Sequence, residues 1–386
     1  MGMLTSLSAD KHVEILTSRG EIEVLRSFWD ACKSHRDADL DYSLFIADLF
    51  ADVLRPHVVV LYDHGIPSAV LVGRLERSRL PIKIGYLKVR TPRVRVIQIT
   101  GWLGKIEENA EYLIQALFRS LDSGEADVIC LRHINVDSAL AVCARNAPPL
   151  LCSDFVTRPQ AHWICTRRCG ESFTATLSRN QQSQQRRRER KIARAFASNR
   201  IKCFRSLEEL NHLFRDAEII ARKTYQRRLG VGFSDSPVIR SRLEFEASKG
   251  WLHAFVLYFD EQPCAFWIGS LRNGEFLSEY LAYDPAFAKY APGMYLMMKG
   301  MESLSSNEKI GSAETIYFGV GEAIYKERLS NKKYQQTIRY IFAPRFGPIL
   351  INALRSAMHY ANAVMTSVFR WAGLTSSARR LGRRLP

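Results

Sequence analysis

Two stretches of the chain, about half its length apart, share one pattern of hydrophobic positions. Residues 57–72 form an apolar, β-branched run, a turn cluster and a second apolar run, which predicts a β-hairpin. Residues 252–268 repeat this plan, with polar turn residues at 260–263. Each hairpin is followed by another strand pattern, at 94–100 and 275–283.

The elements around the hairpins recur as well. A helical pattern follows at 106–121 and 293–304, and a short strand pattern follows at 126–131 and 315–318. Each half also begins with helical patterns. These lie at 22–32, 40–54, 207–225 and 238–248. A repeat of this length indicates a duplicated domain. The order of elements predicts an α+β fold of two tandem domains, each a mixed, mostly antiparallel sheet flanked by helices.

Charge is distributed unevenly along this repeat. The chain has 386 residues, 47% of them apolar and 24% charged, which is the composition of a globular protein, and its net charge is +16. Residues 179–205 hold ten basic residues and one acid, and residues 328–386 hold eleven basic residues and no acid. The remainder is mildly acidic. Length and pattern predict domains at 1–165 and 166–345, followed by a basic C-terminal extension at 346–386.

The sequence argues against secreted, membrane-spanning and metal-binding proteins. The eight cysteines form no CxxC pair, so we expect no metal site, and scattered thiols favour a reducing cytosol. The N-terminus lacks the basic start and apolar core of a signal peptide. No uncharged apolar run reaches the ~20 residues of a membrane span. We expect a cytoplasmic protein, and a peripheral position on the inner face of the membrane stays open.

Three motifs follow one another in the second half. Leu177-Ser178 precedes an arginine-rich helical run that includes 186–191. Tyr283-Asp284 precedes a loop and Ala291-Pro292-Gly293. Gly319-Val320-Gly321-Glu322 leads into Tyr325-Lys326. In this order the motifs resemble the CelD/BcsL-type, or BioF2-like, acetyltransferase family of the Gcn5-related N-acetyltransferase (GNAT) superfamily. The duplication resembles the FemAB-like peptidoglycan aminoacyl transferases. The resemblance covers roughly 170–345 by motif and the first half by pattern only.

The resemblance implies an acyl-CoA donor, and the second motif suits its pyrophosphate. A helix N-terminus binds anions because free N–H groups and the positive end of the helix dipole point at them. Pro292 has no N–H to leave unpaired, and Gly293 admits a phosphate close to the backbone. We expect Gly293, Met294 and Tyr295 to donate, with Lys289 as a further phosphate contact. An ordinary helix start fits the same residues.

Acyl transfer to an amine also requires proton transfer. Glu279 is the candidate base and Tyr283 the candidate acid for the thiolate, on the strand expected to flank the donor. Strand alternation places Glu279, Leu281 and Tyr283 on one face and Tyr280 on the other. A solvated Glu279 and a core-capping Tyr283 fit the pattern as well. His253 is expected to be structural.

Other candidates come from the arginine-rich run and the third motif. They are Tyr325 for catalysis and Arg186, Arg187, Glu322 and Lys326 for substrate binding. The resembled family usually has an acid just before the Gly-x-Gly stretch, where this chain has Tyr317-Phe318. That role is either vacant or taken by Glu322. No nucleophile motif is present, which favours direct transfer without an acyl-enzyme.

The extension has an amphipathic helical pattern. Its apolar stripe comprises Leu350, Leu354, Met358, Ala361, Met365 and Val368, and its tail carries Arg379, Arg380, Arg383 and Arg384. An apolar face with cationic flanks is typical of an interfacial membrane helix. Packing of the stripe on the protein core is the alternative. The first interpretation predicts that deletion of 346–386 moves the protein into soluble fractions.

Together these features predict an acyl-CoA-dependent N-acyltransferase with a catalytic second half. The first half has Gly101-Trp102-Leu103-Gly104 in place of a Pro-Gly helix start, so we expect it to be degenerate and to shape the acceptor cleft. The resemblance implies an amine of a polysaccharide precursor or of an amino-alcohol (sphingoid-like) lipid. The alternatives are a FemAB-like tRNA-dependent aminoacyl transferase and a non-catalytic scaffold that binds membrane or nucleic acid. No nucleic-acid-binding signature is visible. Acyl length, acceptor identity and oligomeric state stay open.

Overall fold

The chain folds into two compact units. The computed structural model describes residues 10–32, 38–80, 82–84, 87–89, 91–156, 159–228, 230, 232–306 and 312–371. One unit comprises Met1–Pro159 and Gln336–Pro386, and the other comprises Gln160–Gln335.

The first unit is built on a mixed sheet with the order β1-β3-β4-β7-β8-β15, in which β2 also pairs with β4. Its strands are β1 (Lys11–Leu16), β2 (Val53–Pro56), β3 (Val58–Asp63), β4 (Ile66–Arg79), β7 (Arg93–Gly104), β8 (Val128–Asn135) and the part of β15 (Lys332–Phe342) from Gln336 onward, with β5 (Ile82–Ile84) and β6 (Leu87–Val89) forming a separate hairpin. Among the described strands of this sheet only β7 and β8 run parallel; the other pairs are antiparallel.

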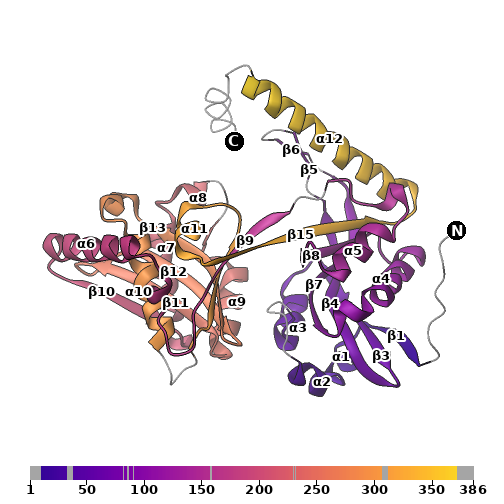
Figure 1. Cartoon of the computed structure of the whole chain (residues 1–386), viewed down its shortest axis with the longest axis horizontal. Helices are drawn as coiled ribbons and strands as arrows, with labels where there is room; N and C mark the ends of the chain where they lie inside the picture. The colour runs from indigo at the N-terminus through magenta and orange to yellow at the C-terminus, as the bar shows by residue number, and fades with distance from the viewer. Residues whose placement is uncertain are drawn as a thin grey trace. The chain divides into compact units, whose positions relative to one another are not determined.

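Helices cover both faces of this sheet (Figure 1). They are α1 (Arg19–Glu23), α2 (Arg26–Ala31), α3 (Leu40–Leu49), α4 (Ile106–Asp122), α5 (Ala139–Asn146), the 3-10 turn η1 (Leu150–Cys152) and α12 (Phe346–Trp371). Side chains of α4 and α5 form one core with β3, β4, β7 and β8. Side chains of α1, α2 and α3 form a second core on the opposite face. The predicted helix at 22–32 is thus two short helices, and the one at 40–54 ends at Leu49 before β2 begins.

The second unit repeats this plan with the sheet order β9-β14-β13-β12-β11-β10. Its strands are β9 (Gln160–Thr166), β10 (Asn199–Phe204), β11 (Leu252–Phe259), β12 (Gln262–Arg272), β13 (Glu275–Tyr283) and β14 (Thr315–Val320). Its helices are α6 (Arg179–Ala195), α7 (Leu210–Ala221), α8 (Tyr225–Arg228), α9 (Pro237–Ser248), α10 (Pro292–Ser306) and α11 (Ile324–Leu329), with 3-10 turns η2 (Phe173–Thr176), η3 (Leu207–Glu209) and η4 (Pro285–Tyr290). Helices α6, α10 and α11 pack on one face, and α7 and α9 on the other.

The two sheets correspond strand for strand. In both, the parallel pair (β7 with β8, β13 with β14) follows an antiparallel hairpin, and one more antiparallel strand completes the edge. Both hairpins turn through two residues with positive φ, His64 and Gly65 in the first unit and Asp260 and Glu261 in the second. The prediction of an α+β fold of two tandem domains is confirmed.

The completing strands do not follow the order of the chain. β9 lies early in the sequence of the second unit, while β15, which follows that unit, completes the sheet of the first. The contacts therefore divide the chain at 159/160 and 335/336, whereas the sequence places the boundaries at 165/166 and 345/346. Hydrophobic pattern reports strands but not their partners, so it cannot reveal this arrangement.

The C-terminal extension is helical as predicted, but it is part of the first unit rather than a separate segment. The arginines at 379–384 lie outside the described residues. No helix within the described ranges has both the length and the apolar character needed to cross a membrane.

Candidate active site

The second unit has a cavity where its two parallel strands separate. β13 and β14 pair only over Glu275–Leu277 and Thr315–Tyr317, although both strands continue further. A cavity of about 540 Å³ lies beyond the end of this ladder. Its lining comprises Thr224, Tyr225, Gln226, Ser278, Glu279, Leu281, Ala282, Tyr283, Pro285, Phe318, Gly319, Val320, Tyr325 and Lys326. The structure thus brings all three predicted catalytic residues together with Lys326.

A β-bulge orients Glu279. β12 pairs Ile268 with Tyr280 but Gly269 with Ser278, so Glu279 is the extra residue of β13. Gly269 is required opposite the bulge, because a Cβ there would lie 2.2 Å from the Leu277 carbonyl oxygen.

The bulge changes which side chains share a face. Tyr280 packs in the core under α7 and α9, and Leu281 packs in the core under α10. The Arg242 guanidinium on α9 contacts both the Glu279 carboxylate and the Tyr280 hydroxyl, the latter at 3.2 Å. Glu279 therefore lines the cavity together with Leu281 and Tyr283, with which the predicted alternation grouped it, and its carboxylate also reaches Arg242 beside Tyr280. The predicted alternation did not include the bulge or this second contact.

Glu279 is part of a buried charge network. Its side chain is 12% exposed and forms an ion pair with Arg242. One turn along α9, the fully buried Glu246 accepts a hydrogen bond from Arg272 at 3.1 Å. Burial, and secondarily the nearby Glu279 charge, raise the pKa of Glu246 to about 8, so this carboxyl is mostly protonated at neutral pH. The network holds the Glu279 carboxylate at the cavity wall.

Helix α11 supplies the opposite wall. The Gly-x-Gly stretch before it turns sharply, since Gly319 and Gly321 have φ of 82° and 92°. Lys326 is only 9% exposed, and its ammonium group donates to the Val320 carbonyl at 2.6 Å. Burial lowers the pKa of Lys326 and raises that of the neighbouring Tyr325. The cavity therefore contains a largely desolvated cation.

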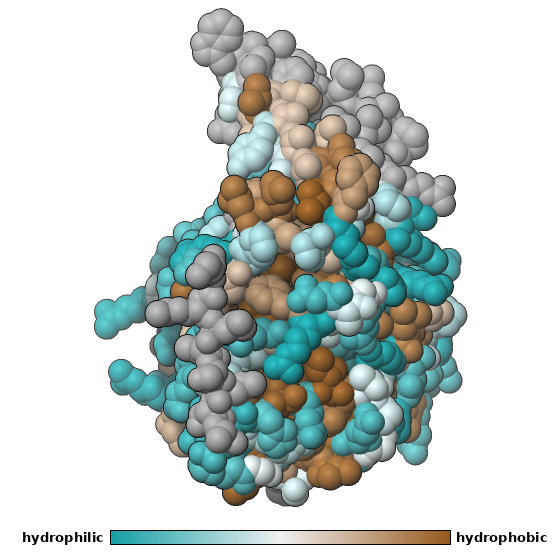
Figure 2. All heavy atoms as spheres, turned by 90° about the vertical axis from the view of Figure 1, so that its right-hand side faces the viewer, coloured by the Kyte–Doolittle hydropathy of each residue, from teal (hydrophilic) through white to brown (hydrophobic). Residues whose placement is uncertain are grey.

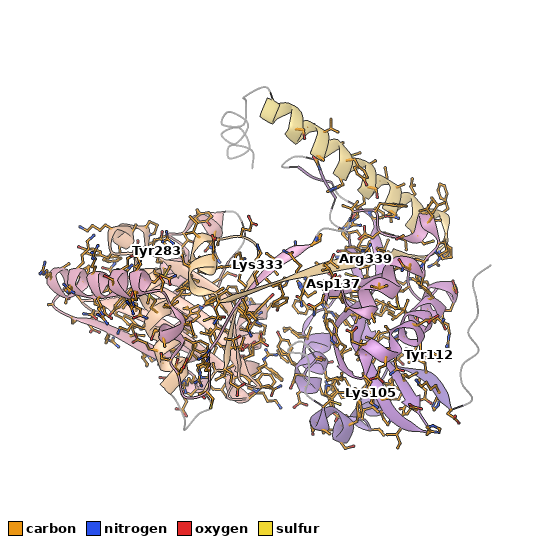
Figure 3. All side chains as sticks on the ribbon, viewed as in Figure 1. Lys105, Tyr112, Asp137, Tyr283, Lys333 and Arg339 are labelled. Atoms are coloured by element: carbon orange, nitrogen blue, oxygen red, sulfur yellow. The ribbon has the colours of Figure 1, made fainter. Side chains whose placement is uncertain are left out.

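The N-terminus of α10 adjoins this cavity. A Cβ placed on Gly293 would lie 3.4 Å from the Tyr283 ring, so the tyrosine covers the glycine at the start of the helix. Tyr283 is 43% exposed at the end of β13 (Figure 3). The candidate acid thus lies between the cavity and the predicted phosphate site.

Two of the three predicted N–H donors remain available at this helix start. The Tyr295 N–H donates to the Ala291 carbonyl at 3.1 Å and is used inside the helix. Its side chain is buried, with the hydroxyl donating to Asn199 at 3.3 Å. No carbonyl of the described backbone accepts a hydrogen bond from the N–H group of Gly293 or Met294.

Two exposed lysines lie beside this turn. The ammonium groups of Lys289 and Lys191 lie 5.0 and 5.4 Å from the centre of the Tyr290 ring, just before α10 begins. Lys191 also donates to the Lys289 carbonyl at 2.7 Å. Lys289, predicted as a phosphate contact, is therefore part of a pair of cations at the helix start.

The remaining predicted residues lie outside the 540 Å³ cavity. Arg186 and Arg187 are exposed on α6, and Arg186 lines a different cavity of about 500 Å³ between α6 and α10. Glu322 is exposed and lines a third cavity of about 330 Å³.

The position before the Gly-x-Gly stretch has a structural role. The Tyr317 hydroxyl bonds to buried His162, and Phe318 packs in the core. Glu322 does not replace the missing acid in the cavity, and Glu279 is the one carboxylate of the described residues that lines it. His253 is structural as expected: it is buried against the Trp251 carbonyl at 3.0 Å, and burial lowers its pKa to about 4.

Sequence reasoning missed the residues that support Glu279. Arg242 and Glu246 are four positions apart on α9, and such a pair usually lies on an exposed helix face. Only the β13 bulge, which the pattern does not show, brings that face against a carboxylate. Tyr225, which lines the cavity from α8, gave no signal either.

The first unit lacks the same constellation. Its equivalent bulge pairs Val72 with Gly101 and Gly73 with Ile99, so Thr100 occupies the position of Glu279. Helix α4 carries Glu107 and Glu108 in its first turn, where α10 has Gly293 and Met294. Two carboxylates there repel a phosphate.

Comparison with known proteins agrees with this geometry. Residues 179–327 match the family model of the acetyltransferase (GNAT) domain. The second unit is a GNAT-type acetyltransferase domain. The predicted resemblance is confirmed at the level of this superfamily, and so is the prediction of an acyltransferase. The match covers the GNAT domain and less than half of the chain. No curated protein sequence matches the chain.

Solved structures resemble both units together. FemX is 11% identical, with a TM-score of 0.57 over 86% of this chain and 98% of FemX. A conserved protein of unknown function from Bacteroides thetaiotaomicron VPI-5482 is 12% identical, with a TM-score of 0.52 over 85% of this chain and 100% of its own. A tandem GNAT protein from the clavulanic acid biosynthesis pathway is 8% identical, with a TM-score of 0.49 over 86% and 99%. At these identities the likeness concerns the fold of the GNAT domain and its partner unit alone.

Proposed function

We propose that the second unit transfers an acyl group from coenzyme A directly to an amine. The observation that carries this proposal is the cavity at the separation of β13 and β14, in which Glu279, Tyr283, Tyr325 and Lys326 converge beside the N-terminus of α10. An acyl thioester entering between the strands would meet a carboxylate, two phenols and an ammonium group.

The donor's pyrophosphate fits the start of α10. The Gly293 and Met294 N–H groups and the positive helix end favour an anion there. Gly293 leaves the space that a side chain would fill, with only the Tyr283 ring at its border. Lys289 and Lys191 add positive charge next to this turn. The described residues contain no cluster of His, Cys, Asp and Glu suited to a metal ion.

The cavity residues divide the chemistry among them. Glu279, oriented by Arg242, accepts the proton of the attacking amine as the new C–N bond forms. The Lys326 ammonium stabilises the negative oxygen of the tetrahedral intermediate, since a preorganised charge in a dry site is most effective there. Tyr283 gives its proton to the departing sulfur as the C–S bond breaks and recovers one from solvent. Tyr325 lines the acceptor side.

The acceptor in this proposal is an amine of a polysaccharide precursor or of an amino-alcohol lipid, met at the membrane surface. The degenerate first unit, with Thr100 and an acidic α4 start, leaves one reactive site per chain. Arg186 and Arg187 take no part in the chemistry, because neither lines the 540 Å³ cavity. In this proposal they contact an anionic part of a substrate.

A second donor class is favoured by one observation. Arg186, Arg187, Arg190 and Arg194 form an exposed cationic stripe on α6, and such a stripe also suits the acceptor stem of an aminoacyl-tRNA.

A thermal-shift screen of the whole chain with coenzyme A, acetyl-CoA, a long-chain acyl-CoA and tRNA separates the two donors. A rise in Tm with thioesters, followed by coenzyme A release in the presence of an amine, supports the proposal. Stabilisation by tRNA with no response to any thioester would replace it with the aminoacyl transferase.

A further inference from the structure

Helix α12 is docked on the first unit by Ile351, which packs in an apolar core, and by several polar side chains on the same side. Asn352 and Ser356 are 1% and 8% exposed. The Asn352 amide donates to the carbonyls of Leu151 and Ser153 at 3.0 and 2.7 Å. Arg355 forms an ion pair with Asp154 at 2.6 Å, and the Asp154 side chain is fully buried. These directional contacts fix the rotation of the helix about its own axis.

The opposite face of α12 is apolar and exposed. The exposed side chains of this face up to Met365 are Phe346, Leu350, Ala353, Leu354, Ala357, Tyr360, Ala361, Val364 and Met365. None of these side chains is charged. Phe346 is 83% exposed and Val364 63%. Helices that face water normally show the reverse arrangement, with the polar side outward.

A neighbouring turn extends this surface. Leu150 and Leu151 of η1 are 76% and 60% exposed, and η1 lies against α12 through the Asn352 bonds. Figure 2 shows hydrophobic side chains gathered over α12, toward the top of the face in view. We call the exposed side chains of this apolar face of α12 and of η1 together the α12 surface. Contiguous apolar surface of this kind marks a binding site.

The charge of the C-terminal segment indicates which kind of partner binds the α12 surface. Residues 328–386 contain no acid, and the sequence after Met365 carries Arg370, Arg379, Arg380, Arg383 and Arg384. A second copy docked through this surface would bring two strongly basic segments together, which is unfavourable. An anionic lipid surface offers hydrocarbon to the apolar side chains and phosphate to the arginines.

We propose that the α12 surface binds the interface of an anionic membrane, with α12 lying in the plane of the headgroups. Phe346, Leu350, Leu354 and Val364 enter the acyl boundary, and the docked polar side of the helix keeps the first unit in the water. The surface belongs to the first unit and its lipid binding does not depend on acyl transfer. It would give the acyltransferase proposed above access to acceptors carried by lipids.

Deletion of 346–386 is a poor test of this proposal. It removes Arg355 from the buried Asp154 carboxylate and so weakens the first unit itself. Substitutions on the exposed face avoid this problem, because Leu350 and Val364 are 44% and 63% exposed. Ala363→Glu is the matched control: Ala363 is exposed on the same helix but lies about 140° around it from Leu350, at 100° per residue.

The experiment is co-sedimentation of the full chain with vesicles of phosphatidylcholine alone and of phosphatidylcholine with 30% phosphatidylglycerol. We expect binding to the anionic vesicles, weakened by salt. The double variant Leu350→Glu, Val364→Glu should lower the partition coefficient by at least about tenfold, because two charges replace two inserted apolar side chains. Ala363→Glu should bind within about twofold of the wild type, and all three proteins should share one Tm and one affinity for coenzyme A.

Three outcomes would overturn the proposal. The first is that the wild type fails to bind anionic vesicles. The second is that the double variant binds them as tightly as the control, which would assign binding to the arginines alone. The third outcome is that light scattering shows a dimer for the wild type and a monomer for the double variant, which would assign the surface to contact with a second copy. Failure of coenzyme A binding in every protein would instead count against the proposed acyl transfer and leave the vesicle result standing.

Discussion

Replacing Gly293 by glutamate places a carboxylate in the first turn of α10, where the donor's pyrophosphate is proposed to bind. The first unit carries this arrangement naturally, with Glu107 and Glu108 in the first turn of α4. An acidic side chain near a helix N-terminus stabilises the helix by about 0.3–1 kcal/mol, so the fold should not suffer. The substitution therefore separates ligand binding from folding.

The expected loss of affinity follows from charge repulsion. Two like unit charges 4 Å apart repel by about 1 kcal/mol in water and by about 4 kcal/mol at an effective dielectric constant of 20. We therefore expect Gly293→Glu to weaken coenzyme A binding by about fivefold to nearly a thousandfold, since about 1.4 kcal/mol is tenfold. Isothermal titration calorimetry of the full chain measures this directly.

Gly293→Ala is the control for this experiment. A Cβ at Gly293 meets nothing nearer than the Tyr283 ring at 3.4 Å, so alanine should bind coenzyme A within a few-fold of the wild type. Equal affinities of the glutamate and alanine variants would refute the reasoning, because the donor would then lie away from α10. A fall in the Tm of the glutamate variant would show that the substitution acts through folding instead.

Three further predictions concern the cavity and the charge network beside it. Glu279→Gln keeps a hydrogen-bond partner for Arg242 and should lower kcat by roughly 10²–10⁴-fold at unchanged Tm; a variant with wild-type kcat would remove Glu279 as the base. Lys326→Met should lower kcat by roughly 10²–10³-fold while Tm holds or rises, because a buried cation whose described partner is the neutral Val320 carbonyl no longer needs desolvation; lost folding in melting curves would contradict this. Glu246 has a pKa of about 8 in the folded protein against 4.5 in the unfolded chain, so its contribution to stability is complete at acidic pH and is lost as the pH rises through 8. Tm should therefore fall from pH 5 to 8 more steeply in the wild type than in Glu246→Gln. Parallel curves of Tm against pH would show that Glu246 stays ionised.

Elements were predictable from sequence wherever a local pattern determines them. The strand predicted at 275–283 has the observed bounds of β13, and the helix predicted at 293–304 lies within α10. The local pattern did not predict features that depend on strand partners or on irregularities such as a β-bulge. Alternation along β13 holds as far as Ser278, but the bulge at Glu279 turns its carboxylate toward Arg242.

The candidate site shows the same division. Tyr283, Tyr325 and Lys326 were identified from motif positions and Glu279 from its place on the strand before the second motif, and the fold brings them to one cavity. Arg186 and Glu322 were chosen for charge and motif membership, but neither property determines the direction in which a side chain points. For α12 the sequence predicted the apolar stripe, while Asn352 and Arg355, which decide that the stripe faces outward, look like ordinary polar positions.

The late position of β15 in the sequence affects the order in which the two units fold during synthesis. Until β15 leaves the ribosome, the first unit lacks the strand that pairs with β8, although residues 1–159 of that unit have been synthesised much earlier. The second unit, in contrast, begins with its own edge strand β9 and has a complete sheet when β14 emerges. A chain that ends at residue 330 and has left the ribosome should therefore contain a protease-resistant GNAT domain behind a first unit that is still open along one strand. The GNAT domain, although later in the sequence, is complete before the first unit.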